Sequence, residues 1–145
     1  YHMSCFVETE TGRDHRWCMD CSVCCKMYLL IKACGFDPRN VGLNRNMLNE
    51  EMREYFSLFG GSDVNTYALT GRGRDEQLFA FYLAWKNGDR SGLVQEFEVK
   101  FLDEAKARED ELYKTFFGLH DTITLPGEVK EKAISIYREV LSDVP

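Results

Sequence analysis

All six cysteines lie in the first 34 residues of the chain, and four of them fall within eight consecutive positions. In chain order they are Cys5, Cys18, Cys21, Cys24, Cys25 and Cys34. A secreted, disulfide-rich domain normally spreads its cysteines over the whole fold, because each bridge stabilises most when it closes a separate long loop. The crowding therefore favours a metal site over a set of disulfides.

The crowded cysteines follow the pattern Cys-x2-Cys-x2-Cys, from Cys18 through Cys21 to Cys24. This spacing places three thiolates on one tight turn, which suits a tetrahedral ion with sulfur ligands at about 2.3 Å. Cys5 is the natural fourth ligand, so the sequence predicts a zinc site. An ion with four cysteine ligands has no open coordination position, and we expect it to be structural rather than catalytic.

The sequence leaves this ligand set open to competing interpretations. His15 precedes the crowded segment by three residues and could replace Cys5, giving a Cys3His site. An iron–sulfur cluster also uses Cys-x2-Cys-x2-Cys, but its bacterial form continues with Cys-x3-Cys-Pro, which does not follow here. One Cys-x2-Cys pair could instead serve in redox chemistry, or the cysteines could all be free thiols. Cys25 and Cys34 fall on a predicted helix and are expected to pack as small apolar residues.

Length and charge narrow the class of protein. A chain of 145 residues corresponds to one domain overall. Lys and Arg number 18 against 24 Asp and Glu, so the net charge is −6, which argues against nucleic acid or an anionic membrane as the main partner. No apolar run approaches the roughly 20 residues of a membrane-spanning helix, and we expect a cytoplasmic protein. Residues 1–3 are interpreted as a cloning-vector remnant.

Apolar residues recurring at helical spacing predict a mainly α fold. We expect about five helices, at roughly 24–34, 46–59, 75–86, 92–117 and 126–141. The polar stretch 62–73 is predicted to be a loop. The expected architecture is a compact domain in which a zinc-pinned cysteine hairpin and the first helix, residues 4–35, support a helical bundle over 36–145.

The cysteine region resembles a known family. Ser4-Cys5-Phe6, the stretch from Trp17 to Cys24, and the following helix that ends at Gly35-Phe36-Asp37-Pro38 are similar to the C-terminal segment of 7-cyano-7-deazaguanine synthase-like enzymes. These are PP-loop ATP pyrophosphatases of the HUP class. The resemblance implies a structural zinc ion held by four cysteines, here Cys5, Cys18, Cys21 and Cys24. The gap between Cys5 and Cys18 is longer than the family pattern.

The resemblance implies that this chain is a non-catalytic part of a larger enzyme. The ATP-binding loop of this family lies upstream of the cysteines, so ATP would bind only in a preceding domain. We therefore expect a zinc-stabilised accessory domain of an ATP-dependent ligase-like or synthase-like enzyme, docked on its own N-terminal domain. A second hypothesis is a free-standing zinc-containing module that binds a protein partner. Loops that open helices often face a neighbouring active site, which makes Arg72, Arg74 and Glu76 candidate substrate-binding residues. No catalytic residue is predicted.

Overall fold

The computed structural model describes residue 5 and residues 17–118 and 126–141. These residues are mainly helical, and no strand occurs among them, which confirms the predicted fold class. The chain divides into two compact units, 1–108 and 109–145. The division falls inside the segment predicted as one helix over 92–117, and we describe each unit separately.

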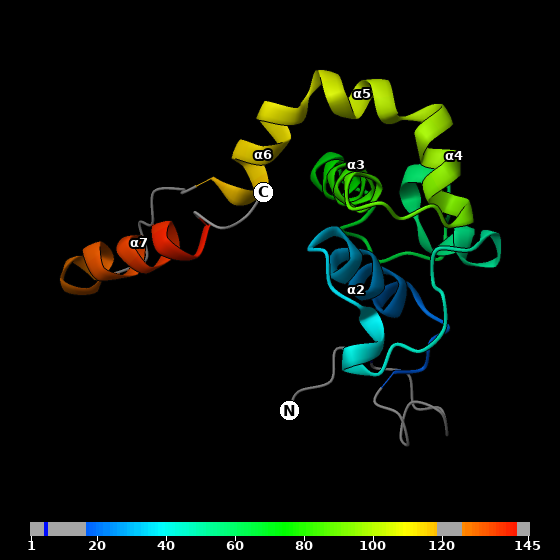
Figure 1. The fold of residues 1–145 in the computed structure, drawn as a ribbon, viewed down its shortest axis with the longest axis horizontal. Helices are drawn as coiled ribbons and strands as arrows, with labels where there is room; N and C mark the ends of the chain where they lie inside the picture. The colour runs from blue at the N-terminus through cyan, green and yellow to red at the C-terminus, as the bar shows by residue number, and fades with distance from the viewer. Residues whose placement is uncertain (1–4, 6–16, 119–125, 142–145) are drawn as a thin grey trace. The chain divides into compact units, whose positions relative to one another are not determined.

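Helix α2 (Ser22–Ala33) begins directly at the crowded cysteines, as predicted (Figure 1). Gly35 ends it at a φ of +77°, a conformation that favours glycine. The backbone N–H groups of Gly35 and Phe36 donate to the carbonyls of Lys32 and Ile31, each at 3.0 Å. Both bonds satisfy carbonyls that the helix end would otherwise leave without partners. The short 3₁₀ helix η1 (Pro38–Val41) follows.

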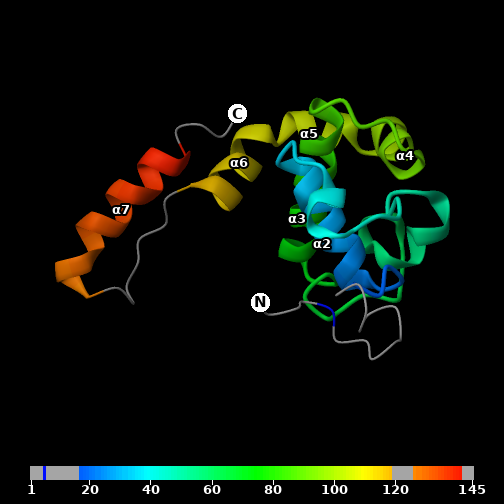
Figure 2. The same cartoon turned by 60° about the horizontal axis from the view of Figure 1, so that its bottom comes forward.

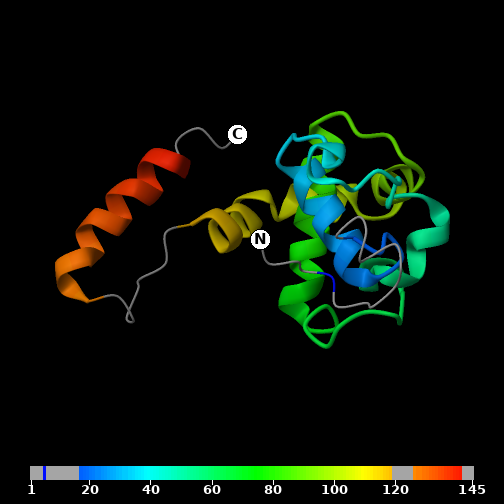
Figure 3. The same ribbon diagram turned by 90° about the horizontal axis from the view of Figure 1, so that it is seen from below.

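Helix α3 (Gly71–Lys86) is the centre of the first unit. It lies alongside α2 in all three views and also contacts α4 and α5 (Figures 1–3). Its buried residues occur on nearly every side of the helix: Gly73, Leu78, Phe79, Ala80, Phe81, Tyr82 and Ala84. A helix that is apolar almost all round belongs inside a core. The predicted helix at 75–86 is confirmed and begins earlier than expected.

The early start of α3 has a local cause. The Thr70 hydroxyl accepts the backbone N–H of Gly73 at 3.1 Å, which caps the first turn. A Cβ atom at Gly73 would lie 2.1 Å from the carbonyl oxygen of Tyr67. Only glycine lets this turn approach the preceding backbone so closely. The glycines predicted to belong to a loop are therefore part of the helix start.

The predicted helix over 46–59 is wrong in type. The segment contains two 3₁₀ helices, η2 (Glu50–Tyr55) and η3 (Ser57–Phe59), with Phe56 extended between them. Most of its predicted apolar side chains are nevertheless buried, namely Met47, Leu48, Met52, Phe56 and Phe59. The apolar pattern identified the buried residues, although the backbone between them is not an α-helix.

A tertiary hydrogen bond explains this departure. The carbonyl of Leu48 accepts the backbone N–H of Leu93 at 2.9 Å, from the start of another helix. In an α-helix that carbonyl would accept the N–H of Met52. Here Met52 instead donates to the carbonyl of Asn49 at 3.1 Å, three residues back, which is the 3₁₀ pattern.

The predicted helix over 92–117 is divided into α4 (Gly92–Lys100), α5 (Leu102–Ala107) and α6 (Glu109–Phe117). Phe101, with φ −129° and ψ −7°, bends the chain between α4 and α5. The bend lets both helices follow the side of α3. Aromatic rings fill the space between them and the 3₁₀ segments: Phe56, Phe59, Phe81, Phe97 and Phe101.

Ion pairs also join α5 to α3. The guanidinium of Arg74 contacts Glu104 at 2.7 and 2.8 Å, and that of Arg108 contacts Asp75 at 2.8 Å twice. A further contact of 3.4 Å links Arg108 to Glu104, which connects the two pairs. Bidentate contacts between Arg and a carboxylate fix the relative orientation of the two side chains as well as their distance.

The second unit contains α6 and α7 (Gly127–Leu141), and α7 agrees with the predicted helix over 126–141. The rings of Tyr113 and Phe117 pack with centroids 5.3 Å apart on α6. Across the part of the chain that the structure describes, no helix has both the length and the apolar character needed to cross a membrane.

Candidate metal centre

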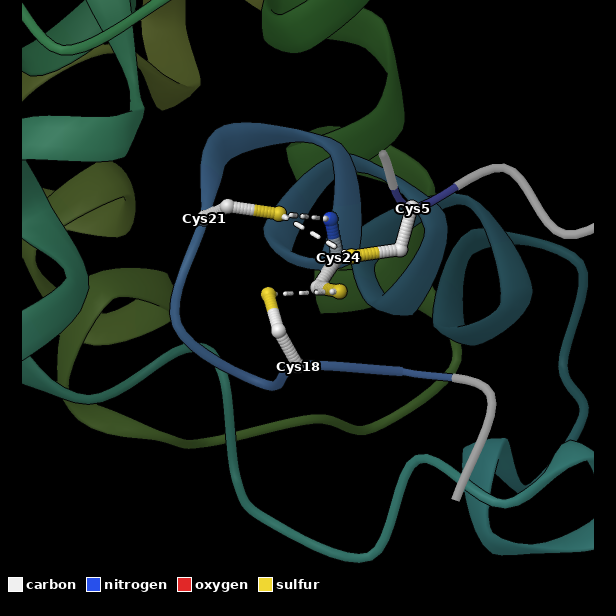
Figure 4. A group of neighbouring side chains, drawn as sticks. All are labelled: Cys5, Cys18, Cys21 and Cys24. Atoms are coloured by element: carbon white, nitrogen blue, oxygen red, sulfur yellow. Dashed lines mark hydrogen bonds between the residues drawn. The ribbon is translucent and has the colours of Figure 1, made fainter. Parts of the chain in front are cut away.

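The four cysteines predicted as ligands lie together at the N-terminus of α2 (Figure 4). Their sulfur atoms all lie within 4.8 Å of one another. The Sγ atoms of Cys18 and Cys24 are 3.7 Å apart, and those of Cys5 and Cys21 are 3.9 Å apart. All four are free thiols rather than disulfides.

These separations match the size of a tetrahedral sulfur site. With metal–sulfur bonds of about 2.3 Å, the edge of a regular sulfur tetrahedron is about 3.8 Å. The two measured contacts, 3.7 and 3.9 Å, are close to that edge. Since all the remaining sulfur pairs lie within 4.8 Å, small side-chain rotations bring the four atoms to one ion. The cluster could therefore hold a metal ion.

The burial of the cysteines favours a metal site with no open coordination position. Cys5, Cys18 and Cys24 are buried, and Cys21 is partly exposed. Several uncompensated thiolates in such surroundings would be costly, so a cation or protons must balance them. Cys25 is buried within α2 and Cys34 is exposed at its C-terminal end, and neither belongs to the cluster.

Backbone N–H groups point at two of the sulfurs. The amide of Asp20 donates to Cys18 Sγ at 3.4 Å, and that of Cys24 donates to Cys21 Sγ at 3.5 Å. Cys21 is the N-cap of α2, where helix amides lack other partners. Both bonds stabilise sulfur in its negatively charged form.

The cysteines differ in acidity because of these contacts. A hydrogen bond from the Cys24 side chain, with help from the amides of Val23 and Cys24, lowers the pKa of Cys21 to about 5. Burial raises the pKa of Cys18 to about 12. The hydrogen bond with Cys21 also raises the pKa of Cys24. The shifts of Cys21 and Cys24 are opposite because the hydrogen bond between them favours the negative charge on Cys21 and the proton on Cys24.

Side chains from distant segments hold the cysteine turn in place. The Trp17 indole N–H donates to the carbonyl of Val41 at 2.8 Å. Arg45 Nη1 donates to the carbonyl of Met19 at 3.3 Å. The Tyr55 hydroxyl donates to the carbonyl of Asp20, also at 3.3 Å. The turn is thereby fixed to η1, to η2 and to the loop between them.

The backbone of the turn itself is strained at Met19. Its φ is +55°, and among the described residues it is the non-glycine residue with a positive φ. The left-handed region costs a residue with a side chain roughly 1–2 kcal/mol. Strain of this kind persists where surrounding contacts over-determine the backbone, and it occurs often at functional sites.

Sequence reasoning identified the four cysteines and missed the residues that position them. Arg45 and Tyr55 come from segments far along the chain, and no local motif marks either one. Arg45 also contacts Glu51 at 2.9 Å, in a surface ion pair that any polar loop could contain. His15, the competing fourth ligand, lies outside the described residues.

The predicted substrate-binding residues have partners within the first unit. Arg74 pairs with Glu104, and Glu76 pairs with Lys26 at 2.6 Å. Arg72 is exposed near Tyr67 at the start of α3. These contacts join α3 to its neighbours, and a role in substrate binding stays a prediction.

Comparison with known proteins adds no assignment. No protein-family model, curated protein or solved structure matches the chain. The resemblance to PP-loop ATP pyrophosphatases therefore stays a prediction.

Proposed function

We propose that Cys5, Cys18, Cys21 and Cys24 bind one zinc ion, and that the chain is a zinc-stabilised accessory domain without catalysis of its own. The observation that carries the zinc site is the convergence of four sulfur atoms at tetrahedral spacing. Four thiolates and no imidazole or carboxylate make a soft donor set, which selects zinc over magnesium or calcium.

The metal would stabilise one particular part of the fold. Cys5 is far in sequence from the other three cysteines, so the ion would tie Cys5 to the N-terminus of α2. α2 in turn packs on α3, the centre of the first unit. Zinc in a closed four-ligand site contributes to folding directly, and it leaves no coordination position for a substrate.

The accessory role rests on the resemblance of the cysteine region to the C-terminal segment of PP-loop ATP pyrophosphatases. In that role the domain would form one wall of a substrate site whose ATP-binding loop belongs to a preceding domain.

The contrasting role is a free-standing protein-interaction module. The exposed Val129, Ile136 and Val140 of α7 favour that second candidate, because exposed apolar side chains gathered on one helix often mark a contact surface.

Metal analysis tests the zinc site. We expect one zinc per chain in protein purified under reducing conditions without added metal. Replacement of the ion by Co²⁺ should give the intense visible absorption of tetrahedral thiolate coordination. Metal-free protein that retains its thermal transition would contradict the proposal. Iron with acid-labile sulfide would instead support an iron–sulfur cluster.

Matched cysteine variants test the ligand set. Cys5→Ser and Cys24→Ser should each lose the zinc, whereas Cys34→Ser should retain it because Cys34 lies outside the cluster. His15→Ala tests the competing fourth ligand directly. Zinc retained in Cys5→Ser and lost in His15→Ala would replace Cys5 by His15 in the ligand set.

The two roles are distinguished by what precedes residue 4 in the natural gene. A Ser-Gly-Gly-x-Asp-Ser loop upstream would support the accessory domain, and the longer protein should then release pyrophosphate from ATP. A gene without such a loop would support the interaction module. Neither outcome bears on the zinc site, which the metal analysis tests by itself.

A further inference from the structure

The apolar stripe of α7 is exposed and runs the length of the helix. Val129, Ile136 and Val140 are 47%, 51% and 62% exposed, and the half-buried Ala133 lies between them on the same face of the helix. The spacing of 4, 3 and 4 residues is that of the seam of a two-helix coiled coil. Figure 2 shows α7 as one continuous helix, and Tyr137 borders the stripe at 56% exposure.

A helix of this kind needs a partner. Isolated helices of about 12–15 residues are only marginally stable in water, and most helices in proteins are stabilised by packing an apolar face. α7 has 15 residues, and none of its described side chains is buried. Exposed apolar residues arranged as a seam are therefore expected to be covered.

The sequence of α7 is complementary to itself when reversed. About a midpoint between Ile134 and Ser135, the antiparallel direction places Val129 opposite Val140 and Ala133 opposite Ile136. Each apolar seam residue thus meets another apolar seam residue. A two-fold axis relates the partners in such a pair, so every contact occurs twice.

Charge follows the same symmetry. In an antiparallel pair, the residues on one flank of the seam face the residues on the corresponding flank of the partner helix. Lys132 and Glu139 both flank the same side of the stripe, so each lysine would approach the glutamate of the other copy. A parallel pair would lack these contacts, because the opposite flank carries Lys130 and Tyr137. The complementary charge favours a second copy of this chain over an unrelated apolar surface.

We propose that α7 is a homodimerisation helix, which pairs antiparallel with α7 of a second copy through Val129, Ala133, Ile136 and Val140. The inference does not depend on the zinc site. A seam of two heptads buries less than the roughly 800 Å² per partner of a standard stable interface. We therefore expect a weak dimer, with a dissociation constant on the order of 10–100 µM.

Sedimentation equilibrium of the whole zinc-loaded chain tests the proposal. The wild-type protein should show a concentration-dependent monomer–dimer equilibrium, and Ile136→Glu should be monomeric. Wild-type protein that remains monomeric up to about 1 mM would overturn the proposal. Such a result would mean that this chain itself or another protein covers the stripe.

Charge-reversal variants distinguish specific antiparallel pairing of α7 from non-specific association. Lys132→Glu should weaken the dimer about tenfold, because the introduced carboxylate would face Glu139 of the other copy. The double variant Lys132→Glu/Glu139→Lys restores opposite charges and should recover most of the affinity. Arg138→Glu is the matched control, since it makes the same charge change on the opposite face of α7. Equal weakening by Arg138→Glu, or no recovery in the double variant, would overturn the antiparallel arrangement.

Discussion

α3 and α7 are helices of nearly equal length, 16 and 15 residues, in opposite circumstances. α3 is buried on several sides by α2, α4, α5 and the 3₁₀ segments. α7 buries none of its described side chains, and its most exposed aliphatic residues, Val129, Ile136 and Val140, lie on one stripe. α3 is held helical by its neighbours, and α7 depends on its own sequence and on whatever covers its stripe. The two units of the chain should therefore respond differently to the same perturbation.

Removal of the metal should have the largest effect and should separate the two units. If the four cysteines bind zinc as proposed, a chelator with reductant should destabilise the first unit by several kcal/mol, since a structural zinc ion contributes directly to folding. We expect the near-UV circular dichroism of the packed aromatic residues to be lost. Any far-UV helical signal that remains should come from α6 and α7, which lie outside the first unit.

The control for metal removal is Cys34→Ser, which should behave as the wild type because Cys34 is not in the cluster. An unchanged near-UV spectrum after verified zinc loss would contradict the prediction. It would mean that packing around α3 holds the first unit together without an ion.

Truncation of a single side chain should show the same contrast on a smaller scale. Phe81 on α3 is fully buried, and its ring packs against Phe56, Phe59 and Phe97. Phe81→Ala should lower the free energy of unfolding by about 3–5 kcal/mol, through lost burial and a new cavity. Ile136→Ala on α7 should cost less than about 0.5 kcal/mol at dilute, monomeric concentrations. Denaturant unfolding of both variants checks the comparison, and equal losses would contradict it.

The ion pairs between α3 and α5 should make a smaller, pH-dependent contribution. Arg108 beside Asp75 lowers the pKa of that carboxyl, and Arg74 beside Glu104 lowers the pKa of Glu104. Because both values are depressed in the folded state, their stabilisation is fully present above the unfolded values of about 4. It is lost as the pH falls through the folded values.

Asp75→Asn tests this contribution with little change in size. The variant should be less stable than the wild type by about 1 kcal/mol at pH 7, since the pair is partly exposed. The difference should shrink as the pH falls from about 4 towards the depressed pKa of Asp75, where that carboxylate becomes protonated in the folded protein. Asp103→Asn, an exposed carboxylate on α5, is the control and should leave stability nearly unchanged. A difference that persists unchanged at low pH would show that the charge of Asp75 does not cause it.

The sequence predicted the features that depend on local spacing. The Cys-x2-Cys-x2-Cys turn identified three of the four clustered cysteines, and a glycine marked the end of α2 at Gly35. The helical pattern around Phe81 identified α3 as central to the core. In each case the residues that determine the structure are neighbours along the chain, so a pattern can reveal them.

Features set by distant contacts could not be predicted. The 3₁₀ start of η2 accompanies a hydrogen bond from Leu93 to the carbonyl of Leu48, which no local pattern encodes. The bend at Phe101 follows from packing on α3. Arg45 and Tyr55 reach the cysteine turn across the fold, and no local motif marks either residue.

The spacing of the cysteines also has a consequence for the order in which the chain folds. Cys18, Cys21 and Cys24 span seven residues, so they can meet around an ion within the time of a local loop closure. Cys5 must close a longer loop, and the contacts of α2 with α3 join segments that are far apart in the chain. We therefore expect a metal-loaded turn and a nascent α2 to form first, as a template on which the slower pairing of distant segments takes place.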